Sequence, residues 1–148
     1  MLQQFKGWLF GIPGTPVEHE NAFLRLKGDS GVEAAIERLR NAVQHNTEKA
    51  GALLAAQGIF IVADTFALDH AWPKLPILIS LGSLVVGAFL VMSILRSTMR
   101  MYRHNAENFD PLREIYALLL SRMIRFNLAL YLTFLSILLL AIAAMSFV

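Results

Sequence analysis

The stretch VEAAIERLRNAVQHNTEKAGALLAAQGIFIVADTFAL, residues 32–68, decides the fold of this chain. Residues that are mostly apolar or small recur along it with spacings that alternate between four and three, which places them on one face of a helix. We call this face the seam, and it comprises Val32, Ile36, Leu39, Val43, Asn46, Ala50, Leu53, Gln57, Phe60 and Asp64. Because no proline interrupts the stretch, we expect one unbroken helix.

The faces outside the seam change character at Ala50. Before this residue they carry charged side chains, as at Glu37 and Arg38, which suit contact with water. After it they carry large apolar side chains, as at Leu54 and Ile59, which suit contact with lipid. The first half of the helix is therefore predicted to stand in water and the second half to cross a membrane.

The composition of the whole chain also indicates a membrane protein. Of its 148 residues, 56% are hydrophobic and only 16% are charged, and the mean hydropathy is +0.54, too apolar for a soluble domain of this size. Three apolar runs, 50–68, 75–95 and 126–148, meet the roughly 20 residues that a helix needs to cross the bilayer core. They lack the alternation of barrel strands, so the predicted fold is all-α, with three transmembrane helices.

The basic residues are distributed unevenly about these three runs. Six lysines and arginines precede the first run, one follows it, and six lie between the second and the third. Since basic residues accumulate on the cytoplasmic side, we expect the N-terminus and the second loop in the cytoplasm. Segments 32–49 and 96–125 then form a cytoplasmic helical stalk, while residues 1–31 form either an interfacial helix or a linker that packs on the stalk or is disordered.

Two polar residues of the seam lie inside the first apolar run. Gln57 and Asp64 are expected to face other protein or a pore, because an ionisable group in hydrocarbon is costly unless it finds a partner or water. Hydrogen bonding between helices and a functional polar pathway both account for them. Six other seam residues form a predicted interface between copies of the chain, because heptad-like spacing and close packing favour self-association. Its residues are Ile36, Leu39, Val43, Ala50, Leu53 and Phe60.

Six arginines lie between the second and third apolar runs: Arg96, Arg100, Arg103, Arg113, Arg122 and Arg125. Guanidinium groups on converging helices can form an anion site, because they match the geometry of phosphate. Contact with lipid headgroups is the other interpretation, since arginines at the cytoplasmic ends of spans orient a membrane protein.

The sequence offers little for conventional catalysis. There is no cysteine, and the four histidines are dispersed without the paired spacing of a metal site. Phosphate-binding glycine motifs and the nucleophile elbow of hydrolases are also missing. We therefore expect a protein that is not an enzyme, with no metal, no cofactor and no nucleic-acid partner.

Two short stretches resemble a known family. EKAGALLA, residues 48–55, leads into the first apolar run, and LSRMIRF, residues 120–126, leads into the last. Both are similar to the transmembrane effector module of Pycsar-type bacterial antiphage systems, over roughly residues 33–148 of this chain. The resemblance implies a multi-pass protein of the bacterial inner membrane that damages this membrane when infection is sensed, in that family through a cyclic pyrimidine nucleotide. This chain departs from the family in having no separate nucleotide-binding domain, so a soluble partner is the other expected trigger.

These observations combine into a functional hypothesis. A homo-oligomer whose seam is packed shut at rest, and opens when a nucleotide signal or partner acts on the stalk, would leak ions. The alternative is a non-enzymatic membrane anchor or assembly subunit that holds a soluble partner through the stalk. A constitutive channel or carrier is less well supported, because no broken span or internal repeat marks a substrate site at the midplane.

Overall fold

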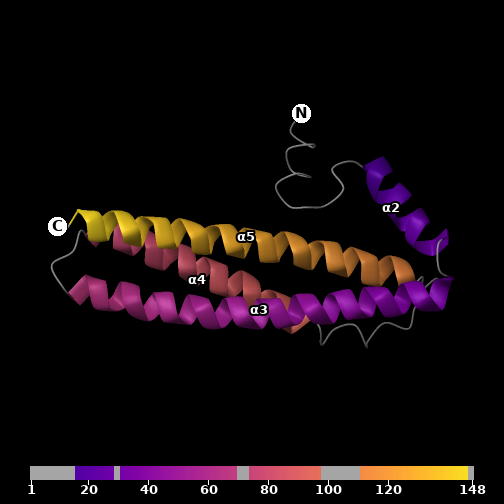
Figure 1. Ribbon diagram of the computed structural model, residues 1–148, viewed down its shortest axis with the longest axis horizontal. Coiled ribbons are helices and arrows are strands. Elements are labelled where there is room, and N and C mark those ends of the chain that lie inside the picture. The colour runs from indigo at the N-terminus through magenta and orange to yellow at the C-terminus, as the bar shows by residue number, and fades with distance from the viewer. Residues whose placement is uncertain (1–15, 29–30, 70–73, 98–110, 147–148) are drawn as a thin grey trace. The chain divides into compact units, whose positions relative to one another are not determined.

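The computed structural model describes residues 16–28, 31–69, 74–97 and 111–146. These residues form helices, with no strand among them (Figure 1). The helices are α2 (Pro16–Gly28), α3 (Val32–Asp69), α4 (Lys74–Ser97) and α5 (Pro111–Met145). The predicted all-α fold is confirmed for this part of the chain.

Three of these helices are long and apolar enough to cross a membrane. They cover Val32–Asp69, Lys74–Arg96 and Leu112–Met145, and each contains a strongly apolar window of 18 residues. The predicted runs 50–68 and 75–95 fall within them, and the third, 126–148, falls within the last one as far as Met145. Length and composition thus indicate a membrane protein with three candidate spans.

Helix α3 begins after a glycine in a conformation that other residues rarely adopt. Gly31 has a φ of 77°, and its carbonyl accepts a hydrogen bond from the amide of Ala35 at 3.1 Å. From Val32 onward no proline interrupts the hydrogen bonding, which explains the unbroken helix of 38 residues. From the sequence, Asp29 or Ser30 is the expected N-cap of this helix; both lie outside the described residues, as do residues 1–15.

The chain divides into two compact units, and α3 and α5 supply residues to both. Unit 1 contains residues 1–47 and 100–124, and unit 2 contains residues 48–99 and 125–148. In unit 1 an aliphatic core joins α3 to α5, with Leu39 and Val43 against Leu112 and Ile115. Phe23 of α2 packs on this core. Burial of these side chains holds unit 1 together.

Unit 2 is built from α3, α4 and α5, which run side by side in Figure 1. Small and medium residues occupy its interior, such as Ala50, Ala129 and Val91, whereas Val62 and Phe89 are 69% and 74% exposed. A water-soluble bundle would bury its largest apolar side chains, but a helix bundle in lipid gains most from close contact between small residues. The distribution of side chains in unit 2 therefore fits a hydrocarbon environment.

Candidate functional site

The interior of unit 2 contains a layer centred on the amide of Gln57. This side chain is fully buried, and its Nε2 donates a hydrogen bond of 2.9 Å to Oγ1 of Thr133 on α5. The Thr133 hydroxyl in turn donates to the carbonyl of Ala129 at 2.9 Å. On α4, Gly87 faces this amide, because a Cβ at that position would lie only 2.7 Å from Gln57 Nε2. Three helices therefore approach one amide, and the glycine provides the space.

A second polar layer is centred on the carboxyl group of Asp64. Its Oδ2 accepts a hydrogen bond of 2.6 Å from Oγ of Ser80 on α4, and Ser136 Oγ on α5 lies 2.7 Å from the same hydroxyl. The same Ser80 hydroxyl lies 3.3 Å from the carbonyl oxygen of Ser136, and either serine can be the donor in the contact between the two hydroxyl groups. These contacts link α3, α4 and α5 in one layer. All three residues are almost completely buried.

The two layers fix the directions of the helices in unit 2. Gln57 and Asp64 are seven residues apart, a rise of about 10 Å along α3. On α4 the residues that meet them, Gly87 and Ser80, occur in the opposite order, so α4 runs antiparallel to α3. We call the five side chains of the two layers the polar core: Gln57, Asp64, Ser80, Thr133 and Ser136.

Two oxygen atoms of the polar core have no hydrogen-bond partner in the part of the chain that the structure describes. They are Oε1 of Gln57 and Oδ1 of Asp64, and both are buried. Buried polar atoms in folded proteins are nearly always paired, because leaving one unpaired costs on the order of 1 to 3 kcal/mol. An unpaired oxygen in each layer therefore leaves room for another arrangement in which water, a cation or another donor satisfies it.

The structure also places the other seam residues. Leu39, Val43, Ala50 and Leu53 are buried against helices of the same chain, and Ile36 and Phe60 are half-buried. Their packing within one chain accounts for the spacing, so an interface between copies on this face stays a prediction. Val32 does not belong to the buried face. It is 47% exposed, and Ala35, completely buried, is the first buried residue of α3, since an α-helix drifts relative to a strict 3.5-residue repeat.

Within the described residues, two of the six arginines belong to unit 1 and two to unit 2. Arg122 is completely buried in unit 1, where Nη1 donates to Oγ1 of Thr47 at 3.2 Å. Arg113 is exposed in the same unit. In unit 2 Arg96 is exposed, whereas Arg125 is half-buried and donates from Nη1 to Ser93 Oγ at 3.3 Å. Positions 100 and 103 lie outside the described residues.

Sequence reasoning missed the two hydroxyl partners on α5. Thr133 and Ser136 are three residues apart in an apolar run, and this spacing puts both hydroxyl groups on one face of a helix. That pair was the available signal, because hydroxyl groups inside spans commonly bond to other helices. Among the described residues, no group of three or more His, Cys, Asp and Glu side chains is placed to hold a metal ion.

Comparison with known proteins found no matching family model, no matching curated protein and no matching solved structure.

Proposed function

We propose that this chain is an inner-membrane effector that permeabilises the membrane when triggered. The polar core carries this proposal, because it holds an aspartate and a glutamine between helices whose outer faces are apolar. Insertion of an aspartate costs at most about 2.5 to 3.5 kcal/mol on translocon scales, the value for the centre of a span, and Asp64 lies about 7 Å from the centre of the first apolar run. A bundle that only had to hold its helices together could do so with small residues alone. An ionisable group at this depth therefore supports a role in moving ions.

The structure of unit 2 corresponds to a closed state in this proposal. Gln57 is bonded to α5 and Asp64 to α4 within the same unit, and Gly87 lets the helices approach closely. Separation of α4 from α3 would break the contacts of Ser80 and expose both unpaired oxygens to water. A single unit of three helices cannot surround a wide aqueous path, so we propose that several copies assemble in the leaking state.

The trigger is proposed to act on unit 1. A pocket of about 240 Å³ in this unit is lined by residues of α2 and α5, including His19, Phe23, Arg113 and Tyr116. The rings of Phe23 and Tyr116 lie 5.9 Å apart. A cation and aromatic rings are suited to a nucleotide or to a partner's side chains. The resemblance to Pycsar-type effectors favours antiphage defence as the setting, a cyclic pyrimidine nucleotide as one trigger, and a cytoplasmic position for unit 1.

A membrane anchor for a soluble partner is the second candidate function. Unit 1 favours it, because this unit has its own aliphatic core and its own pocket. In that case the polar core would serve only to hold α3, α4 and α5 together. The two candidates differ in whether the membrane leaks.

Potassium release from vesicles that contain the purified protein tests the proposal. Wild type should release potassium when cyclic CMP or cyclic UMP is added, or when the protein-to-lipid ratio is raised. Asp64→Asn should release it about fivefold more slowly, the factor given by about 1 kcal/mol of lost attraction for a cation in a water-filled path. The matched control is Asp69→Asn, at an exposed position at the end of the same helix. Vesicles that stay tight under both conditions would favour the anchor.

A further inference from the structure

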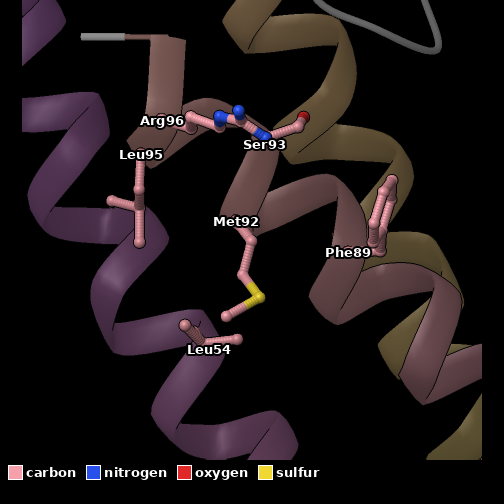
Figure 2. Close-up of a pocket in the computed structure, with 6 residues that line it drawn as sticks. All are labelled: Leu54, Phe89, Met92, Ser93, Leu95 and Arg96. Atoms are coloured by element: carbon pink, nitrogen blue, oxygen red, sulfur yellow. The ribbon is translucent and has the colours of Figure 1, made fainter. Parts of the chain in front are cut away.

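A groove lies on the surface of unit 2 between α3 and α4, separate from the polar core (Figure 2). Its volume is about 420 Å³. Five of its lining residues come from the last turns of α4, namely Phe89, Met92, Ser93, Leu95 and Arg96, and Leu54 comes from α3. This volume lies within the range that small-ligand sites occupy.

The groove is apolar along most of its length and polar at one end. Figure 2 shows Arg96 beside Ser93 at one end, while the side chain of Met92 extends toward Leu54 further along. Phe89 and Arg96 are seven residues apart on α4, which corresponds to about 10 Å along the helix. Arg96 directly follows the second apolar run, so this length would extend from the headgroup level into the hydrocarbon layer.

A second arginine reaches the polar end from α5. Nη1 of Arg125 donates to Oγ of Ser93 at 3.3 Å, and Ser93 itself donates to the carbonyl of Leu90 at 2.6 Å. Ser93 thus holds the guanidinium group of Arg125 at a position three residues, about one turn of α4, from Arg96. None of the described residues that line the groove has an acidic side chain. The guanidinium group of Arg96, together with that of Arg125 on the lining serine, is suited to a phosphate group.

We propose that this groove binds an anionic phospholipid of the surrounding membrane. One acyl chain lies against Leu54, Met92 and Phe89, and the phosphate group contacts Arg96 and Arg125. A soluble anion would leave the apolar part of the groove unfilled. A helix from another copy could also fill it, but its binding would not depend on the charge of the added lipid. The proposal is independent of ion leakage, because it concerns the surface of the closed bundle.

Native mass spectrometry of the full chain in detergent tests the binding. Dioleoyl phosphatidylglycerol should stay bound in preference to dioleoyl phosphatidylcholine, which has the same acyl chains but no net charge. The double variant Arg96→Gln with Arg125→Gln should lower this preference about tenfold, because each basic residue near an anionic headgroup contributes to binding. Arg40→Gln is the matched control, since Arg40 is an exposed arginine of unit 1.

The acyl part of the proposal has its own variant. Leu54→Trp fills the groove and should reduce retention of phosphatidylglycerol while both arginines are kept. Circular dichroism and elution volume show whether each variant folds; if the double variant does not, Arg96→Gln alone makes the same comparison with a smaller effect, since Arg96 is exposed. Equal retention of the two lipids by wild type would overturn the proposal. Displacement of phosphatidylglycerol by inorganic phosphate alone would identify the site as one for a soluble anion and would also overturn it.

Discussion

The amide of Gln57 is held by a single hydrogen bond, and a glycine on another helix makes that bond possible. Gly87 contributes no side chain, so the amide passes over α4 and reaches Thr133 on α5. An added methyl group at position 87 would lie 2.7 Å from Nε2, well inside van der Waals contact. The amide is the flexible end of a long side chain, so it would turn away and lose Thr133.

Gly87→Ala and Thr133→Val should therefore destabilise the protein through the same lost hydrogen bond. Each should lower the free energy of unfolding in mixed micelles by about 0.6 to 1.7 kcal/mol, the range for hydrogen bonds between membrane helices. The double variant should cost little more than either single one, because the bond can be lost only once. The control is Gly82→Ala on the same helix, where an added Cβ meets nothing within 4 Å. Additive losses would show that Gly87 and Thr133 act independently.

Burial along α3 could be read from the sequence, whereas the hydrogen-bond partners could not. The four-three spacing places Gln57 and Asp64 on the face that the structure buries, because spacing along one helix defines its faces. Their partners are 16 to 76 residues away in the chain. Which hydroxyl meets which carboxyl depends on the register between helices, and only tertiary packing determines that register.

At the scale of single elements, helix ends followed from local chemistry. The start of α5 at Pro111 was predictable, since proline at a first helical position loses no hydrogen bond. The start of α3 at Val32 followed from the glycine that precedes it. The buried Arg122 was not predictable in the same way. An arginine near the end of an apolar run is usually a headgroup contact, and only packing in unit 1 pairs it with Thr47.

The orientation of the helices gives a prediction for single cysteines, which can be introduced without interference because the chain has none. Lys74→Cys, at the start of α4, and Ser146→Cys, just after α5, should react with an impermeant maleimide added to intact bacteria. Glu37→Cys, on an exposed face of α3 in unit 1, should react only after the membrane is permeabilised. The expectation follows from the proposed orientation, in which the segments rich in basic residues lie in the cytoplasm. Reaction of the cysteine at position 37 in intact cells would reverse the proposed orientation.

At the scale of the whole molecule, stability and proposed activity make opposite demands on unit 2. Close packing around Ala50, Val91 and Ala129 stabilises the closed bundle. The unpaired oxygens of Gln57 and Asp64 make this state less favourable than a fully satisfied one. A trigger shifts a conformational equilibrium by the difference between its affinities for the two states. A closed state that contains unpaired oxygens therefore needs only a modest difference in affinity to open.

The most direct test of this account is whether the bundle must open before the membrane leaks. Leu54 of α3 and Met92 of α4 line the same surface groove of unit 2, and the side chain of Met92 extends toward Leu54 (Figure 2), so cysteines at both positions can be joined by a short bifunctional thiol reagent with a reducible link. Potassium release from vesicles is measured before joining, after joining and after reduction, with each single cysteine as a control. The account predicts that joining α3 to α4 stops the triggered release and that reduction restores it. Equal release from joined and unjoined protein, or no release from either, would contradict it.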